Sequence, residues 1–168
     1  MDFDALFDAY YGPLRRYCHR LAGDADAGED AAQETFVRLL EREPQGDRDG
    51  IRSWLFTVAT HLIRDRVRVA TNRRRLLDGN AAVVPEGPDG PDVAVERRER
   101  AQTARAALDT LPQRDRRILL LREEGLSYRE LAQVLEVAPG SVGTLLARAR
   151  RRFADAVREQ GGGDESPG

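Results

Sequence analysis

Two short stretches of the sequence concentrate arginine, a residue whose side chain binds anions. The stretch RDRVRVATNRRR (64–75) holds six arginines and one aspartate, and GSVGTLLARARRRF (140–153) holds four arginines and no acid. Guanidinium groups bind phosphate oxygens through paired N–H donors, so arginines clustered on helices are typical of contacts with nucleic acid. A basic stretch can also be a solvated helix face, so neither stretch decides the function alone.

The acidic residues gather in a different part of the chain. The stretch DADAGEDAAQE (24–34) carries five acids and no base, whereas the whole chain has a formal charge of only −2 at pH 7. Such a separation of charge favours distinct binding faces over a uniformly solvated surface.

Composition bounds the class of protein. The 168 residues are 40% hydrophobic and 33% charged, which is typical of a soluble protein with one ordinary domain or two small ones. No apolar run approaches the roughly 20 residues of a membrane span, and the acidic N-terminus is unlike a signal peptide. Cys18 is the single cysteine, and with His19 and His61 it forms no metal-ligand motif. We therefore expect a cytoplasmic protein with no membrane insertion, no metal and no cofactor.

Apolar residues recur at helical spacing through the first third of the chain. They predict a helix from Phe3 to Leu21 that stops at Gly23, a second helix over 26–40, and a third from Ile51 to about Arg68. The segment 41–50, rich in Pro, Gly and Asp, is predicted to be a loop. No segment alternates as a β-strand does, so these elements predict a helical bundle.

The composition changes at residues 78–93, which contain three prolines, three glycines and four acids. Such a segment buries too little apolar surface to offset its ordering entropy, so it is predicted to be flexible. Helical spacing resumes at Ala101. The expected fold is all-α, with two small helical domains joined by a flexible linker. The expected boundaries are 1–77 for the first domain, 78–95 for the linker, 96–158 for the second domain and 159–168 for a disordered tail.

A helix-turn-helix is predicted near the C-terminus. Ser127 and Glu130 have the spacing of a capping box, and the helix that they start is broken by EVAPG (136–140). A second amphipathic helix follows from about Gly140. In DNA-binding proteins the second helix of such a pair lies in the major groove, although an ordinary helical hairpin would have the same pattern.

Three motifs resemble those of the extracytoplasmic-function (ECF) sigma factors, in that family's order. GLSYRELAQVLEVAPGSVGTLLARARRRF (125–153) is similar to region 4, and LPQRDRRILLLRE (111–123) to the helix before it. AGEDAAQETFVRLL (27–40) resembles region 2.2, and IRSWLFTVATHLIRDRVR (51–68) resembles regions 2.3 and 2.4. The resemblance implies a protein that binds core RNA polymerase and promoter DNA, is controlled by an anti-sigma factor and catalyses no reaction.

The resemblance also implies where the polymerase binds. The second helix would dock on a coiled coil of the largest polymerase subunit, through positions that match Asp30, Gln33, Glu34, Phe36 and Leu40. Carboxylates and an amide can pair with basic partner residues, while Phe36 or Leu40 anchors the contact in apolar surface.

Two DNA-binding surfaces follow from the same resemblance. The −10 element would contact the third helix and its preceding loop through Arg52, His61, Arg64, Asp65 and Arg68, with Arg66 also following phosphates. The family frequently has Asn where this chain has His61. Trp54 could stack on a base, but its place on the apolar stripe favours core packing.

The −35 duplex would contact Arg129, Ser141, Thr144, Arg148, Arg150 and Arg151. Arg152 belongs to the same basic cluster. Gly143 and Leu145 stand where the family commonly has basic or polar residues, so we expect weaker direct base recognition and more dependence on DNA shape. Gly143 could instead allow a close approach of the backbone.

Two other functions remain compatible with parts of the sequence. A helix-turn-helix regulator could bind operator DNA alone, although no separate dimerisation segment is visible. Glu29, Asp30 and Glu34 could instead hold a metal in a helical phosphohydrolase.

Overall fold

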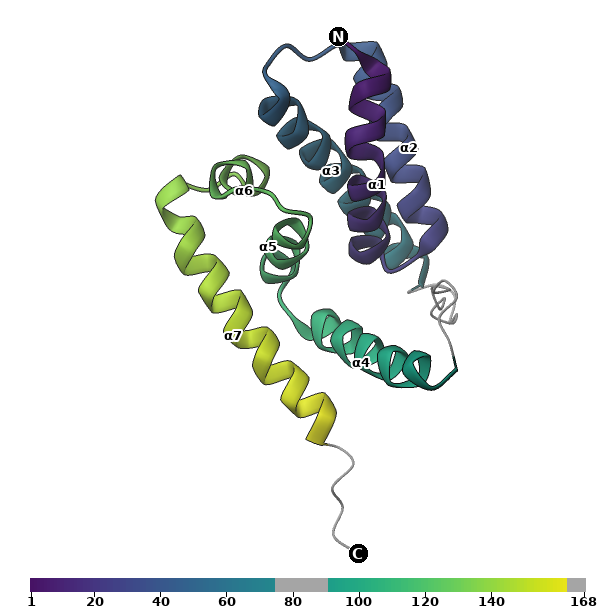
Figure 1. The fold of residues 1–168 in the computed structure, drawn as a ribbon, viewed down its shortest axis with the longest axis vertical. Coiled ribbons are helices and arrows are strands. Elements are labelled where there is room, and N and C mark those ends of the chain that lie inside the picture. The colour runs from purple at the N-terminus through teal and green to yellow at the C-terminus, as the bar shows by residue number, and fades with distance from the viewer. Residues whose placement is uncertain (75–90, 163–168) are drawn as a thin grey trace, which may run out of the picture.

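The computed structural model describes residues 1–74 and 91–162, and within these ranges it is helical with no strand. It therefore confirms the predicted all-α class. The side chains of residues 67–74, 91 and 92 are outside the description. Figure 1 shows the helices in two groups that lie against each other. Among the described residues no helix is long and apolar enough to cross a membrane.

The first group contains α1 (Phe3–Ala22), α2 (Ala25–Arg42) and α3 (Arg48–Arg74). Asp2 and Asp24 cap α1 and α2, because each carboxylate accepts a hydrogen bond from a backbone N–H of the first turn. Gly23 ends α1 with a φ of 66°, as predicted. The predicted loop 41–50 is shorter in the structure, since α2 continues to Arg42 and α3 begins at Arg48.

Aromatic and aliphatic side chains fill the centre of this bundle. Tyr17, Leu39 and Phe56 are fully buried. The Tyr17 hydroxyl forms a hydrogen bond with Thr60 Oγ1 at 2.8 Å, so this buried polar group has a partner. Cys18 is buried beside Tyr17, and burial raises the pKa of its thiol to about 12. The bundle is therefore a packed unit that fixes the outward faces of α2 and α3.

The second group contains α4 (Pro91–Thr110), α5 (Gln113–Glu123), α6 (Tyr128–Leu135), the 3₁₀ turn η1 (Pro139–Ser141) and α7 (Val142–Gly161). Leu121, Leu131 and Leu146 are buried in this group and belong to one hydrophobic cluster that also includes the buried residues of the first group. Helix α4 begins inside the predicted linker 78–95, so positions 91–95 are helical; residues 75–90 lie outside the described part of the chain. Likewise α7 takes in residues 159–161 of the predicted tail, and 163–168 are not described.

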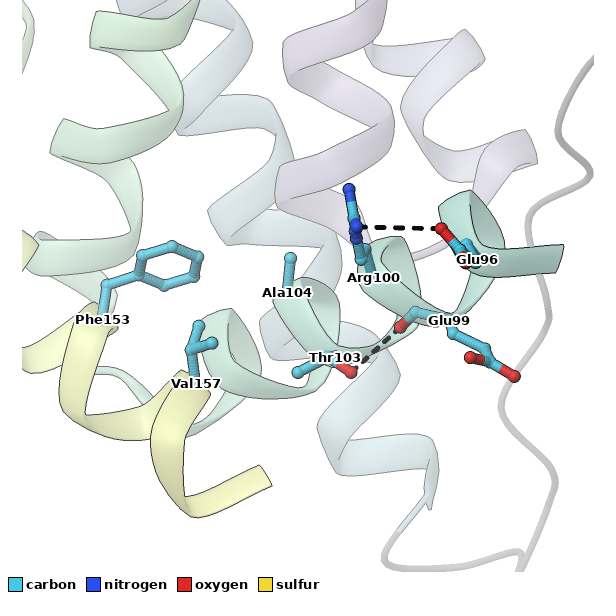
Figure 2. A pocket seen from close by; sticks show the side chains of 7 residues that line it. All are labelled: Glu96, Glu99, Arg100, Thr103, Ala104, Phe153 and Val157. Carbon is cyan, nitrogen blue, oxygen red and sulfur yellow. Dashed lines mark hydrogen bonds and ion pairs between the residues drawn. The ribbon is translucent and has the colours of Figure 1, made fainter. Parts of the chain in front are cut away.

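A groove separates α4 from the end of α7 and has a volume of about 470 Å³ (Figure 2). One rim carries an Arg100–Glu96 ion pair at 3.8 Å, and Thr103 donates a hydrogen bond to the Glu99 carbonyl at 2.9 Å. The groove is lined by Glu96, Glu99, Arg100, Thr103, Ala104, Phe153 and Val157. None of the residues predicted to bind polymerase or DNA lies there.

Candidate protein- and DNA-binding surfaces

The predicted polymerase-binding residues of α2 divide between surface and core. Asp30 and Gln33 are exposed, and Glu34 is half-buried and paired with Arg38 at 2.9 Å. Asp30 faces Arg66 of α3 at 3.5 Å. Arg66, predicted to follow DNA phosphates, is thus turned toward α2, where it also donates to the Ala27 carbonyl at 3.3 Å.

Phe36 does not lie on the proposed docking surface. It is 3% exposed and packs edge-on against Phe7 and Tyr11, with ring centroids 5.1 and 5.6 Å away. Leu40 is 53% exposed. Of the two apolar residues predicted to bind polymerase, Leu40 is therefore the one that is accessible to a partner. The structure corrects the role of Phe36 from anchor to core residue, because α1 covers this side of α2.

Two further apolar residues join Leu40 on the surface. Val37 is 47% exposed on α2 and Phe7 is 38% exposed on α1. Gln33, Val37 and Leu40 follow helical spacing of four and three residues, so they share one face. The spacing within α2 could have identified Val37, whereas the contribution of Phe7 depends on how α1 packs.

Glu29 connects α1 to α2 through its side chain. Its carboxylate accepts hydrogen bonds from the Tyr11 hydroxyl at 2.5 Å, from Arg15, and from Gln33 at 3.3 Å. The hydrogen bond from Tyr11, followed by that from Arg15, lowers the pKa of Glu29 to about 2.

The three carboxylates of the phosphohydrolase alternative do not converge. Glu29 is held by Arg15, Asp30 faces Arg66, and Glu34 pairs with Arg38. In the described part of the chain, no three His, Cys, Asp or Glu residues gather as metal ligands would. This arrangement gives that alternative no support.

The predicted −10 residues of α3 fall into an exposed stripe and a covered end. His61, Arg64 and Asp65 are exposed and lie on one face by their spacing. Arg68 continues that spacing, but its side chain is outside the description. Trp54 is half-buried against the core, as expected.

Arg52 lies at the covered end of α3. It is in contact with the second helical group, where its Nη2 donates to the Glu124 carbonyl at 2.9 Å. Its Nε lies 3.5 Å from Glu130 Oε1. Arg52 is therefore not free for DNA in this conformation.

The predicted capping box at the start of α6 is confirmed. Ser127 N donates to Glu130 Oε2 at 2.7 Å, and Glu130 N donates to Ser127 Oγ at 3.2 Å. Helix α6, the turn η1 and helix α7 follow in the order of a helix-turn-helix, and Figure 1 shows α7 running along the outside of the molecule.

The predicted −35 residues are all exposed: Arg129, Ser141, Thr144, Arg148, Arg150 and Arg151. Spacing along α7 places Thr144, Arg148 and Arg151 on one face, with Ser141 just before it. Arg150 lies about 100° around the helix from Arg151. The stripe is thus polar at its N-terminal end and basic further along.

Arg152 does not extend this basic surface. Its Nη1 lies 2.6 Å from Asp115 Oδ2, and the Asp115 side chain is only 2% exposed. Arg152 therefore joins α7 to α5. Residue type and spacing predict the same basic cluster for Arg152 as for its neighbours, because a partner 37 residues away gives no local signal.

Comparison with known proteins agrees with this architecture. Residues 6–73 match Sigma-70 region 2, and residues 101–153 match Sigma-70 region 4. The ECF RNA polymerase sigma factor EcfG of Rhodopseudomonas palustris is 31% identical, over 92% of this chain and 84% of that protein. SigL of Mycobacterium tuberculosis, another ECF RNA polymerase sigma factor, is 34% identical, over 94% of this chain and 89% of that protein.

Solved structures share the fold. The sigma factor RpoE of Bartonella quintana, in complex with the anti-sigma factor NepR, superimposes with a TM-score of 0.71 at 23% identity, covering 98% of this chain and 99% of that one. CnrH, in complex with the cytosolic domain of CnrY, gives a TM-score of 0.66 at 21% identity, covering 94% and 88%. Two helical groups with matching sequence regions define a two-domain sigma factor. The chain belongs to the ECF family of RNA polymerase sigma factors, and that family is not enzymatic.

Proposed function

We propose that this chain binds core RNA polymerase through the exposed face of α2 and directs the enzyme to promoters. The observation that carries the proposal is a separation of surfaces on one molecule. Asp30, Gln33 and Leu40 form an acidic and apolar face, while the exposed basic residues are Arg64 on α3 and Arg148, Arg150 and Arg151 on α7. An acidic face suits a basic protein partner, and basic faces suit phosphates.

The basic residues of α3 and those of α7 would contact different promoter elements. His61 and Arg64 on α3 suit a melted −10 strand, whose unstacked bases and phosphates accept such donors. Ser141 and Thr144 at the start of α7 suit base edges of the −35 duplex, with Arg148 and Arg151 on phosphates. The −35 contact then contributes more to positioning than to sequence recognition, because phosphates carry no sequence information directly.

An anti-sigma factor is the expected regulator. The solved structures of RpoE and CnrH are complexes with NepR and with the cytosolic domain of CnrY, respectively. A protein that covers the acidic face of α2 or the basic stripe of α7 would block polymerase or promoter binding. We place this activity in the cytoplasm, where bacterial RNA polymerase acts.

Run-off transcription tests the proposal. Core RNA polymerase with this protein on a pool of genomic promoters should give discrete transcripts, whose start sites yield the promoter consensus. Asp30→Arg should lower transcription and core binding together, because it reverses a charge on the docking face. Glu159→Arg makes the same charge change on the exposed end of α7 and should leave core binding unchanged. Tight, specific binding of promoter duplex by the isolated protein, with no effect on polymerase, would instead support a stand-alone regulator.

A further inference from the structure

Side chains of α1 hold the carboxylate of Glu29 in one place and one rotation. Its Oε1 accepts a hydrogen bond from the Tyr11 hydroxyl at 2.5 Å, and its Oε2 accepts one from Arg15 Nε. His19 Nε2 lies 3.4 Å from the same Oε2. Because the two hydrogen bonds reach different oxygens, the carboxylate cannot turn without losing one of them. The Glu29 side chain is 30% exposed, so this arrangement lies at the edge of the surface.

Gly28 allows α1 to come close enough for these contacts. A Cβ at this position would lie 2.7 Å from His19 Cα and 2.6 Å from His19 Cδ2, which is closer than Cβ atoms approach other atoms. Only glycine therefore fits where α2 passes α1 beside Glu29. This close approach lets side chains of α1 reach a carboxylate that belongs to α2.

The same carboxylate contacts Gln33, an exposed residue one turn further along α2. Gln33 Nε2 donates to Glu29 Oε1 at 3.3 Å. An ionised carboxylate can only accept hydrogen bonds, so the amide nitrogen of Gln33 faces Glu29 and the amide oxygen faces away from it. Burial raises the pKa of the Tyr11 hydroxyl, and a hydrogen bond with Gln33 opposes that rise, which puts the same amide group beside Tyr11.

This orientation decides what the docking face offers to a partner. Asp30 is exposed three residues before Gln33, so the carboxylate of Asp30 and the outward oxygen of Gln33 lie on one face. Both are hydrogen-bond acceptors, and they suit the guanidinium or ammonium donors of a basic partner. A glutamine that is already held in one orientation also loses less rotamer freedom on binding than a mobile one.

We propose that Glu29 is a positioning residue for the polymerase contact. It holds the Gln33 carboxamide with the oxygen outward, where this oxygen accepts a hydrogen bond from an arginine or lysine of the polymerase subunit. Glu29 acts through Gln33, because its own oxygens are occupied by hydrogen bonds within the chain. The inference deepens the proposed function and rests on it, since it requires polymerase to bind this face of α2.

Exchanging the two residue types tests the proposal on surface-immobilised core polymerase. Glu29→Gln replaces one of the two acceptor oxygens, and Gln33→Glu places two carboxylates one turn apart, where they repel. Each single variant should bind core polymerase about three- to tenfold more weakly, the range expected when one side chain must be ordered on binding. For Gln33→Glu this result is the opposite of what charge alone predicts, because a more acidic face should bind a basic partner more tightly.

The double variant Glu29→Gln/Gln33→Glu has the wild-type net charge and a hydrogen bond of reversed polarity. The new amide nitrogen at position 29 donates to the new carboxylate at position 33, which again directs an acceptor oxygen outward. Core affinity should therefore return toward the wild-type value. The free energy of unfolding should stay low, because Tyr11 and Arg15 still lack the carboxylate at position 29. If Glu29 only joined α1 to α2, affinity would instead follow stability through the whole set.

Two further measurements complete the test. Glu159→Gln removes one negative charge from the exposed end of α7 and is the matched control, which should leave core affinity unchanged. NMR of the ¹⁵N-labelled full chain gives a readout without polymerase. One carboxamide proton of Gln33 points at a carboxylate in the wild type, so the two protons should differ more in chemical shift there than in Glu29→Gln.

Several results would overturn the positioning role. They are wild-type core affinity for Glu29→Gln, tighter binding by Gln33→Glu, a double variant that stays weak, and Gln33 carboxamide shifts that do not respond to Glu29→Gln. If the wild-type chain does not bind core polymerase at all, the proposed function fails and this inference fails with it. If the wild type binds and the exchange variants give any of the contrary results, the positioning role alone is wrong.

Discussion

Arg152 and Asp115 form an ion pair, 2.6 Å between Nη1 and Oδ2, that joins the DNA-binding helix α7 to α5. The carboxylate is almost fully buried, while the guanidinium is 46% exposed. Arg152 therefore has a structural role. It stands in a run of three arginines (150–152), so residue type alone does not distinguish it from its two neighbours.

Arg152→Ala should destabilise the protein by about 2 kcal/mol, because it leaves the Asp115 carboxylate buried without its charged partner. Urea unfolding followed by circular dichroism measures the loss. Arg151→Ala is the matched control: its side chain is exposed, so the free energy of unfolding should change by less than about 0.5 kcal/mol. Affinity for −35 duplex should fall for Arg151→Ala. Equal destabilisation by the two substitutions would contradict the assignment.

Glu29→Gln should lower stability at neutral pH by about 1–2 kcal/mol, allowing for the partial exposure of the site. The folded-state pKa of Glu29, about 2, is below its ordinary value of 4.5. Its carboxylate therefore stabilises the fold above pH 4.5, and this contribution is lost as the pH falls toward 2. The stability difference between wild type and variant should shrink over that window. A difference that stays constant with pH would show that Glu29 is not the titrating group.

The substitutions Phe36→Ala and Leu40→Ala should distinguish a residue of the core from a residue of the proposed docking surface. Phe36→Ala should cost about 3–5 kcal/mol in the free energy of unfolding, because the ring is buried among other aromatic residues. Leu40→Ala should change stability by less than about 0.5 kcal/mol and weaken binding to core polymerase. Surface-immobilised core polymerase gives the affinities. Wild-type affinity for Leu40→Ala would remove this residue from the proposed docking face.

Gly143→Ala should stabilise the protein by up to about 0.5 kcal/mol, because alanine has the higher helix propensity but Gly143 lies in the first turn of α7, where the preference is weaker than in a helix interior. A Cβ at this position would lie 3.8 Å from the Tyr128 ring, an ordinary contact. It would point toward α6 and away from the stripe of Thr144 and Arg148, so affinity for −35 duplex should be unchanged. A loss of duplex binding with a gain in stability would mean that DNA requires the close approach that glycine permits.

Local signals predicted much of the fold. The stop at Gly23 and the capping box of Ser127 and Glu130 depend on residues within one turn, and the structure has both. Apolar spacing predicts the start of α3 at Ile51, three residues late. The helix begins at Arg48, and its first turn is polar, so it adds nothing to the apolar pattern.

The site was predicted less completely, because its remaining features depend on residues far apart in the chain. Phe36 was assigned to a surface that α1 covers, Arg66 turns to Asp30, and Arg52 meets Glu130, 78 positions later in sequence. A single sequence specifies residue type and spacing, whereas these partners are set by packing between helices.

The buried thiol of Cys18 limits how the protein can respond to oxidants. Peroxides and disulfides react with thiolate, and a thiol with a pKa of about 12 and no exposure forms almost none at neutral pH. Since Cys18 is the chain's one cysteine, thiol-based sensing of oxidative stress would have to occur on a partner molecule. The same inertness lets maleimide probes be placed at engineered surface cysteines while the native residue stays in place.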